Sequence, residues 1–510
     1  MKVLGKTGSE PRACVAVFDW RQYESRLNHA FGEAMFLAFF RLLAGSVSAR
    51  VGAMAGVAIA FAAACTLAAS AVLAAEPEPG MGVAPAPPAP LAAYGDTDLR
   101  RLFSSAPELT VAGEQLNVGL LRRFYARHGF APVWTATRLM QASSLVNAVL
   151  HAGDHGLSPE LFHANLLRVP ATLTPLDREL LLSDAVLSYA DALARGFIPI
   201  ERRPDDEVLT PQPIDVAAVL DRAIDSPDPA AVIEGLAPTT PTYLQLRQAL
   251  ENLKASNAVG RTASTRLRQI EVNLERERWL PRPLPADRVW VNVADERLVL
   301  YRNNWPVFST RVIVGQDERR NQSPEFQTAI NAVLFNPPWN VPQDIAANEI
   351  LPKTASDPGY LARHNMVVLP DGVLQQRAGP NSGLGQLMFD MRNRFDVYLH
   401  DTPSKNLFAR EDRRISHGCI RVEKPRELAA LLMQQPIEAI DQVIATGDTT
   451  RTDLPTPVPV FVVYETAFAD ADGRLQFRPD VYGRDAEVWE YLDPERGAVA
   501  EREPSGQRGG

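Results

Sequence analysis

The sequence predicts an α+β protein, in which an all-helical N-terminal scaffold domain precedes a mainly β domain with short helices. From residue 99 to about residue 285, apolar side chains recur at spacings of three and four, the period of an amphipathic helix. After residue 285, apolar and polar residues alternate, as they do in strands with one buried face. Turn-forming Gly, Pro, Asn and Asp separate these segments.

The bulk composition is that of a folded protein with more than one core. The chain has 510 residues, of which 46% are hydrophobic and 22% are charged, so it is long enough for several domains. Its formal net charge is −9, and no basic stripe stands out. The charge therefore argues against a general nucleic-acid-binding protein.

An export signal or a membrane anchor is predicted at residues 51–75. This segment contains no charged residue, follows Arg50 and runs into acidic, proline-rich sequence. A basic flank, an apolar stretch and small residues near Ala74 are the layout of a secretory signal peptide. The stretch also exceeds the roughly 20 residues that span a bilayer, so an uncleaved anchor is the alternative.

The segments on either side of this stretch are expected to lie outside the folded domains. Residues 1–50 form an N-terminal extension that is unusual before a signal peptide. A translation start at Met35 or Met54 would leave this extension untranslated. Residues 76–98 are rich in Pro and Ala and are predicted to form a stiff, extended linker.

Cysteine usage directs attention to one position. Of the three cysteines, Cys14 and Cys65 precede the expected mature start, so an exported protein cleaved after Ala74 would keep Cys419 alone. A single thiol in an oxidising compartment cannot form an internal disulfide and is open to oxidation. Cys419 therefore needs a functional reason.

Four helices are expected in the scaffold domain, which covers residues 99–285. Apolar residues repeat at helical spacing along 116–129, 179–196, 240–255 and 264–281. Gly129, Gly196 and Pro281 stand where three of these helices should end.

The histidines of the scaffold domain are interpreted as helix-end and surface residues. They are His128, His151, His155 and His163. His151 and His155 are four residues apart, but no further ligand follows at the spacing of a metal site. No metal is therefore expected in this domain.

Three parts are predicted in the C-terminal half. They are a mainly β domain at residues 286–447, a β-hairpin extension at 448–485 and a disordered tail at 486–510. The domain opens with a β-meander at 288–315, in which apolar and polar residues alternate. Short helices are expected at 344–353 and 424–433, the second with Pro425 in its first turn. The extension should turn at the DADG sequence, residues 470–473.

Cys419 lies in RRISHGCIRV, residues 413–422, among polar neighbours. A cysteine nucleophile needs a base or cation that lowers its pKa from about 8.5, donors that hold an oxyanion, and access for the substrate. His400 ends one predicted strand, and Cys419 follows 19 residues later near the start of another. If these strands pair, the imidazole and the thiol can meet.

The residues beside Cys419 could supply the oxyanion donors and the cation that a nucleophile needs. Gly418 has no side chain, which lets backbone N–H groups approach an oxyanion. His417 and Arg421 lie two positions before and after Cys419, so they share its face if the segment is extended. Both could then stabilise a thiolate or hold a substrate carboxylate.

Two structural interpretations compete with a nucleophile. The first is a zinc site, although structural zinc sites usually have more cysteines at regular spacing. Its candidate ligands are His400, Asp401, His417 and Cys419. The second is an inert buried cysteine, against which the polar neighbours argue.

Residues 400–422, HDTPSKNLFAREDRRISHGCIRV, closely resemble the active-site signature of the L,D-transpeptidases, which have a YkuD-type catalytic domain. The segments FNPPWNVP, GPNSGLGQLMFDM and FRPDVYGRD resemble the large periplasmic, YcbB-like branch of this family. The resemblance covers about residues 99–485. Members of that branch often carry an inserted peptidoglycan-binding domain, for which the short connection at 255–264 leaves no room.

This resemblance implies a peptidoglycan L,D-transpeptidase that needs no metal or organic cofactor. Cys419, activated by His400, would remove the terminal D-Ala of a tetrapeptide stem through a thioester and form crosslinks between third-position diamino acids. The backbone carbonyl of Asp401 would orient His400, and the N–H groups of Gly418 and Cys419, helped by His417, would hold the oxyanion. Carbapenems would acylate the same sulfur. The residues expected to bind substrate are Arg421, Ser416, Trp339, Asn340 and Asn381.

The resemblance also implies a periplasmic location, with peptidoglycan stem peptides as the substrate. Cell-wall synthesis proteins are candidate partners of the helical domain, which we expect to brace the catalytic domain while the catalytic cleft alone holds the wall. Membrane contact is expected only through residues 51–75 if they stay uncleaved, and no nucleic acid is expected. Two alternatives remain: a hydrolase of the same fold that trims stems or releases wall-attached protein, and a non-catalytic wall-binding scaffold.

Overall fold

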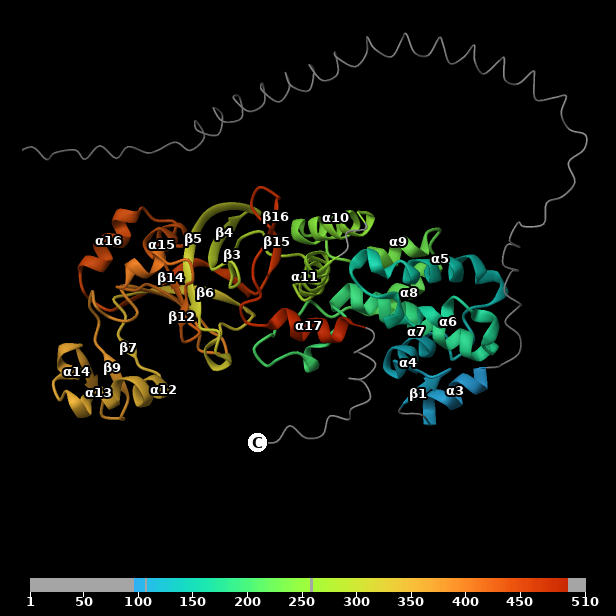
Figure 1. Ribbon diagram of the computed structural model, residues 1–510, viewed down its shortest axis with the longest axis horizontal. Coiled ribbons are helices and arrows are strands. Elements are labelled where there is room, and N and C mark those ends of the chain that lie inside the picture. The colour runs from blue at the N-terminus through green and yellow to red at the C-terminus, as the bar shows by residue number, and fades with distance from the viewer. Residues whose placement is uncertain (1–95, 106–107, 257–259, 494–510) are drawn as a thin grey trace, which may run out of the picture. The chain divides into compact units, whose positions relative to one another are not determined.

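The computed structural model describes residues 96–105, 108–256 and 260–493 (Figure 1). The N-terminal extension, the apolar stretch, most of the linker and the end of the tail lie outside these residues, and what was expected of them stays a prediction. None of the described helices combines the length and the apolarity that a bilayer crossing requires.

The N-terminal part of the described chain is helical, as the sequence predicts. Its longest helix, α7 (Pro175–Arg195), begins where the Thr174 hydroxyl accepts a hydrogen bond from the Asp177 N–H at 3.1 Å, and it ends at Gly196. A short hairpin that the helical pattern did not indicate, β1 (Leu109–Val111) and β2 (Glu114–Leu116), follows the first helix. The other helices are α3 (Asp96–Ser105), α4 (Val118–Arg127), α5 (Leu139–Leu150), α6 (Ala164–Leu167), α8 (Val216–Ile224), α9 (Pro229–Glu234), α10 (Pro241–Ala255) and α11 (Arg261–Arg278).

The histidines of this part divide into two groups. His128 and His151 follow the last residues of α4 and α5, as predicted for helix ends. His155 is instead 1% exposed, and its ring nitrogens lie 2.8 Å from the Tyr243 hydroxyl and 2.5 Å from a Glu234 carboxylate oxygen. The predicted surface position is wrong for His155, because both of its polar atoms find partners that are distant in sequence.

His163 is buried as well, so its predicted surface position is also wrong. Its Nε2 lies 2.9 Å from an Asp184 carboxylate oxygen, and its Nδ1 lies 3.4 Å from a Glu114 carboxylate oxygen. Burial alone lowers the pKa of His163, but the hydrogen bonds and charges of Asp184 and Glu114 outweigh it and raise the pKa to about 9. The ring is therefore a buried cation between two carboxylates at neutral pH.

The C-terminal part is built on a nine-stranded sheet with the strand order β12-β5-β13-β11-β10-β6-β14-β3-β4. Strands β3, β4 and β5 form the antiparallel meander that the sequence predicts, with Asn303 and Asn304 at positive φ in the turn before β5. The first half of β5 pairs with β4 and its second half with β13, so the sheet closes on itself. The strands are β3 (Arg288–Asn292), β4 (Arg297–Arg302), β5 (Trp305–Gly315), β6 (Phe326–Phe335), β10 (Leu387–Met391), β11 (Leu399–His400), β12 (Arg414–Ser416), β13 (Ile420–Val422) and β14 (Thr450–Val463).

The predicted boundary at residue 447 is wrong. Strand β14 lies inside the sheet, antiparallel to β6 and parallel to β3, so the β domain continues to Val463. An alternating pattern predicts a strand but not its neighbours, which long-range pairing decides. Only β15 (Ala467–Ala469) and β16 (Leu475–Phe477) form a separate hairpin, which turns at residues 470–473 as predicted. Helices α15 (Pro425–Met433) and α16 (Ile437–Ala445) precede β14.

The tail predicted to be disordered from residue 486 begins instead within a helix. Helix α17 runs over Arg484–Leu492. It buries Arg484, Val488 and Leu492, which lie four residues apart along one face. The segment is rich in charged residues, so its apolar face was not recognised in the sequence. Two buried hydrophobic residues are enough to pack so short a helix against the domain.

Residues 339–377 form a small subdomain with its own sheet and helices (Figure 1). Its strands are β7 (Trp339–Asn340), β9 (Leu374–Gln376) and β8 (Met366–Val368), and its helices are α12 (Gln343–Ile345), the π-helix η7 (Ala346–Ile350), α13 (Leu351–Ser356) and α14 (Tyr360–Arg363). A separate apolar cluster that includes Val341, Ile350 and Leu374 holds it together. The short helix expected at 344–353 is present within it.

Helix α11 joins the helical part to the end of the β domain through buried polar side chains. Gln269 Nε2 donates to the Thr466 carbonyl at 3.0 Å, and Asn273 Nδ2 donates to the Thr466 hydroxyl at 2.7 Å. One turn further, Arg276 pairs with Asp485 at 2.5 Å. Each of these polar groups is costly to bury without a partner. The helical part and the β domain are therefore held in one relative position by these contacts.

The pKa of His163 generates a prediction about stability and pH. Its folded pKa of about 9 lies above its ordinary value of 6.5, so its contribution to stability is fully present below pH 6.5 and is lost as the pH rises through 9. Chemical denaturation of the wild type and of His163→Asn should therefore give a gap in unfolding free energy that is about 3 kcal/mol larger at pH 6 than at pH 10. A gap that stays constant over this range would contradict the buried cation.

Candidate active site around Cys419

Two neighbouring strands bring the conspicuous residues of the sequence together. Strands β11 and β13 pair in parallel, with Leu399 opposite Ile420 and His400 opposite Arg421. The strand pairing on which a meeting of the imidazole and the thiol depends is therefore present. Residues two apart share a face of a strand, so this register places Tyr398, His400, Cys419 and Arg421 on the same face of the sheet.

His400 is held as a neutral imidazole. It is 4% exposed, and its Nδ1 lies 2.6 Å from the backbone carbonyl oxygen of Asp401. Because a carbonyl only accepts hydrogen bonds, Nδ1 carries the proton and Nε2 is left as the basic nitrogen. Burial, and next the positive charge of Arg421, lower the pKa of His400 to about 3. The ring therefore rests without a proton on Nε2.

The carboxylate of Asp401 has a structural role. Its oxygens accept hydrogen bonds from the Thr402 N–H at 2.7 Å, the Gln386 N–H at 2.9 Å and Lys405 Nζ at 2.5 Å. Gly385, at φ +61°, leaves the space that this carboxylate fills, since a Cβ there would lie 2.5 Å from it. Asp401 thus acts on His400 through its backbone carbonyl, as the family resemblance implies.

Cys419 is half-buried and rests as a thiol. Burial raises its pKa, whereas hydrogen bonds from the backbone N–H and the hydroxyl of Tyr398, and then the charge of Arg421, lower it. Its Sγ lies 3.8 Å from the Asp396 carbonyl oxygen. A thiol in this state requires a base before it can attack a carbonyl carbon.

Arg421 has no counter-ion among the residues that the structure describes. Among the described residues no carboxylate lies within ion-pair distance of it, and its buried Nε has no hydrogen-bond partner. Burial lowers its pKa, and its charge acts on both His400 and Cys419. An unpaired guanidinium beside a thiol is suited to a substrate carboxylate.

A tight turn at Gly418 presents the thiol. Gly418 has a φ of +106°, and its N–H donates to the Ser416 hydroxyl at 3.2 Å, which in turn donates to the Cys419 carbonyl at 2.6 Å. The Ser323 hydroxyl fixes the turn from behind by donating to the Gly418 carbonyl at 2.8 Å. Ser416 is 2% exposed and serves this turn, so we assign it a positioning role in place of the predicted contact with substrate.

The turn also changes the predicted oxyanion donors. The Gly418 N–H is engaged by Ser416, whereas in the part of the chain that the structure describes the Cys419 N–H has no hydrogen-bond partner. His417 does not continue an extended run with Arg421, because the backbone turns at Gly418. Its Nε2 instead lies 2.5 Å from a Glu349 carboxylate oxygen of the 339–377 subdomain.

Comparison with known families agrees with this geometry. Residues 119–250 match the family described as a scaffold domain, and residues 286–462 match the L,D-transpeptidase catalytic domain. The chain carries an L,D-transpeptidase catalytic domain. The matched residues contain both His400 and Cys419.

Individual relatives carry similar names. A Haemophilus influenzae protein named "Putative L,D-transpeptidase" is 28% identical over an alignment of 399 residues that covers 72% of this chain and 78% of that protein. Two solved structures are 10% identical, the Ldtfm–avibactam carbamoyl enzyme and a mutant of the Enterococcus faecium L,D-transpeptidase, with TM-scores of 0.19 and 0.18. They cover 35% and 38% of this chain, and the chain spans 49% and 62% of theirs.

The subdomain contributes unevenly to the site of the L,D-transpeptidase domain. The Trp339 side chain forms a hydrogen bond with Tyr398, and Tyr398 in turn forms hydrogen bonds with Cys419. Asn340 instead accepts a hydrogen bond from Gln375 Nε2 at 2.8 Å, and Asn381 is exposed. Of the three predicted cleft residues, Trp339 alone is linked to the thiol's surroundings by the described contacts.

Tyr398 is the functional residue that the sequence reasoning missed. Its position two residues before His400 could have revealed it, because residues two apart in a strand place their side chains on the same face. The Tyr398 and His400 rings pack edge to face with centroids 5.7 Å apart. The zinc interpretation finds no support in the same contacts, and the described residues contain no group of three or more potential metal ligands.

The role of Tyr398 is tested by the ionisation of the thiol. In Tyr398→Phe the hydroxyl donor is lost, so the pKa of Cys419 should rise. The pH dependence of alkylation by iodoacetamide, followed by mass spectrometry, measures this shift. Tyr360→Phe, in the subdomain, is the matched control and should leave the midpoint in place. A midpoint that is unchanged or lower in Tyr398→Phe would refute the assignment.

Proposed function

We propose that this protein is a peptidoglycan L,D-transpeptidase with Cys419 as its nucleophile. The observation that carries the proposal is the register of β11 and β13, which sets a neutral, oriented His400 on the same face as Cys419 within an L,D-transpeptidase catalytic domain. The substrate class is the peptide stem of peptidoglycan, on which this family acts. We place the reaction in the periplasm, reached through the apolar stretch at residues 51–75.

The first half-reaction forms a thioester. His400 Nε2 takes the thiol proton as the sulfur of Cys419 bonds to the carbonyl carbon of the third stem residue. The Cys419 N–H is free to hold the resulting oxyanion. Collapse of this intermediate breaks the C–N bond to the terminal D-Ala, whose amine leaves with the proton from His400.

The second half-reaction forms the crosslink. The side-chain amine of a third-position diamino acid on a neighbouring stem attacks the thioester carbonyl. His400 accepts a proton from this amine, the C–S bond breaks, and the proton returns to the sulfur. The product is an amide between two third-position residues, and the enzyme is restored with no net change of charge.

Substrate bound to Arg421 would help to activate His400 as the base. The positive charge of Arg421 is the second-largest cause of the low pKa of His400. The carboxylate of the terminal D-Ala, paired with Arg421, would offset this charge and raise the pKa of His400 toward the range that suits a general base. In this arrangement binding of a donor stem makes the imidazole a stronger base.

The proposal is tested by supplying a tetrapeptide donor stem with and without an amine acceptor and analysing the products by mass spectrometry. We expect a dimer joined through third-position residues, D-Ala release, and a thioester mass on Cys419. Cys419→Ala should lose all three and keep its melting transition, because replacing a thiol by a methyl group is a small change. Donor trimming without any dimer would identify a hydrolase of the same fold instead.

The assignment of the base predicts a ranking of two variants. His400→Ala should slow acylation of Cys419 by a carbapenem by about 10²–10⁴-fold, the usual range for a general base. His417→Ala should have a milder effect, because its ring pairs with Glu349 and not with His400 or Cys419. Stopped-flow measurement of the acylation rate tests this, and the reverse ranking would show that the base is misassigned.

A further inference from the structure

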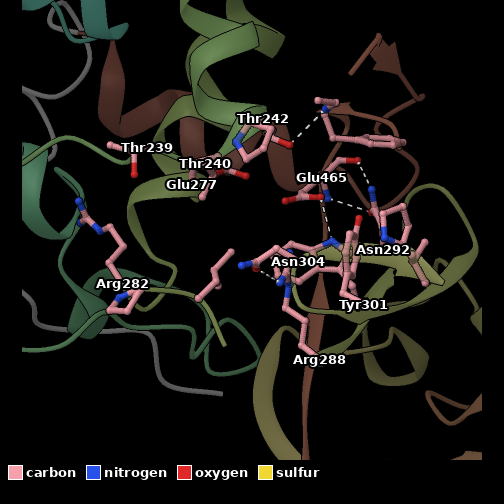
Figure 2. A pocket seen from close by; sticks show the side chains of 18 of the residues that line it. Thr239, Thr240, Thr242, Glu277, Arg282, Arg288, Asn292, Tyr301, Asn304 and Glu465 are labelled. Carbon is pink, nitrogen blue, oxygen red and sulfur yellow. Dashed lines mark hydrogen bonds between the residues drawn. The ribbon is translucent and has the colours of Figure 1, made fainter. Parts of the chain in front are cut away.

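A large cavity, lined by both apolar and polar groups, lies apart from the residues around Cys419. Its volume is about 1370 Å³, and it is lined by the start of α10, the end of α11, strands β3 to β5, and the β15–β16 hairpin (Figure 2). Figure 2 shows Thr240 and Glu277 on one side and Arg288 and Tyr301 on another. The lining includes none of the residues proposed to carry the transpeptidase reaction. The cavity therefore needs its own explanation.

Two buried carboxyl groups meet in its wall. Glu277 is 3% exposed and Glu465 is 6% exposed, and their side chains form a hydrogen bond with each other. Burial, and next the negative charge of Glu277, raise the pKa of Glu465 well above its ordinary value. The pair thus presents several hydrogen-bonding oxygens to the cavity.

The pair is held rigidly. The Thr240 hydroxyl donates to Glu277, and Trp290 Nε1 donates to Glu465 at 3.3 Å. The backbone of Glu465 is fixed by Asn292, whose side chain donates to the Glu465 carbonyl at 3.0 Å and accepts from its N–H at 3.1 Å. Groups fixed in advance bind a ligand with little loss of conformational freedom.

The cations of the cavity are already occupied. Arg282 donates to the carbonyls of Leu236, at 2.5 Å, and Ala194. Arg288 donates to the Pro285 carbonyl and to Asn304, each at 2.9 Å, and its guanidinium lies 4.2 Å from the centre of the Tyr301 ring. Arg297 and Arg478 also line the cavity, and both pair with Asp295. Each of the four arginines therefore has partners within the chain, although the buried Arg288 Nε has none. The cavity is thus less suited to an anionic ligand than one lined by unpaired cations.

The remaining lining combines neutral polar groups with aromatic faces. Thr239 and Thr242 supply hydroxyls, and Trp290 and Tyr301 supply half-buried rings. Trp305, the first residue of β5, is 74% exposed at the rim. The Asn303–Asn304 turn before β5 fixes its backbone. A large, exposed aromatic ring beside a cavity is typical of a binding surface.

We propose that this cavity binds a saccharide, the N-acetylhexosamine glycan strand of the cell wall. The proposal rests on the proposed function, which supplies the glycan. A sugar ring has an apolar C–H face that packs on an indole and hydroxyls that donate to carboxyl oxygens, and its acetamide exchanges hydrogen bonds with threonine and asparagine side chains. The volume exceeds the roughly 300–1,000 Å³ of ordinary small-molecule sites, so it has room for several linked sugar rings.

This inference revises the expectation that the catalytic cleft alone holds the wall. The connection at residues 255–264 leaves no room for the inserted binding domain of related proteins, and a glycan site at the junction of α10, α11 and the sheet would serve in its place. The scaffold part would then contribute directly to wall binding through Thr240 and Glu277.

The experiment measures binding of a β-1,4-linked N-acetylglucosamine hexamer to the full chain by isothermal titration calorimetry. We expect Trp305→Ala and Glu465→Gln each to weaken binding by about tenfold or more. Val307→Ala is the matched control, because Val307 lies on the same strand, is 50% exposed and does not line the cavity. All three variants should keep full carbapenem acylation of Cys419, which shows that they are folded.

Cys419→Ala separates the two proposals, since it lacks the nucleophile and keeps the cavity. It should bind the hexamer as the wild type does, even if the crosslinking assay fails. The glycan site is overturned if the wild type does not bind the hexamer, or if Trp305→Ala binds it as tightly as Val307→Ala does. Because Trp305 is exposed, that comparison stands even if Glu465→Gln does not fold.

Discussion

The turn that carries Cys419 depends on one buried cation, Arg484 of helix α17. Arg484 is 2% exposed and pairs with Glu325 at 3.1 Å and Asp206 at 2.6 Å, and it donates to the Ser323 carbonyl at 3.2 Å. Such a charge is tolerated inside a protein only when its partners surround it. Ser323 in turn holds Gly418, so the pairing of one arginine links the last described helix, the sheet and the scaffold part to the nucleophile.

Local patterns predicted the features that local physics decides. The alternation after residue 285 gave the meander, and the helical spacing gave α4, α7, α10 and α11, because each element buries a face whose period is written along the chain. The pairing of the strands that carry His400 and Cys419 was also open to reasoning from the sequence. Two short strands bounded by these residues, with a polar loop between them, leave few ways to satisfy the backbone except pairing, and the structure adds that they pair in parallel.

Features set by distant contacts were not predictable in the same way. Tyr398 acts on Cys419 across a strand pair, and the surface positions expected for His155 and His163 failed because their carboxylate partners come from other helices. The sequence reasoning assumed an extended backbone through Gly418 and therefore expected His417 to share a face with Arg421. The chain instead turns at Gly418, which has a positive φ, and His417 pairs with Glu349. Spacing along a sequence reports a face only while the backbone stays regular.

The place of β14 has a consequence for the order in which the protein is made. β14 is the last strand of the sheet along the chain, yet it lies between β6 and β3, which were synthesised more than a hundred residues earlier. Both strands must wait with unpaired edges until residue 463 is available. A product cut short before residue 450 would contain His400 and Cys419 but not the strand that joins the two halves of the sheet. Premature termination would therefore release a chain that bears the motif without a formed site.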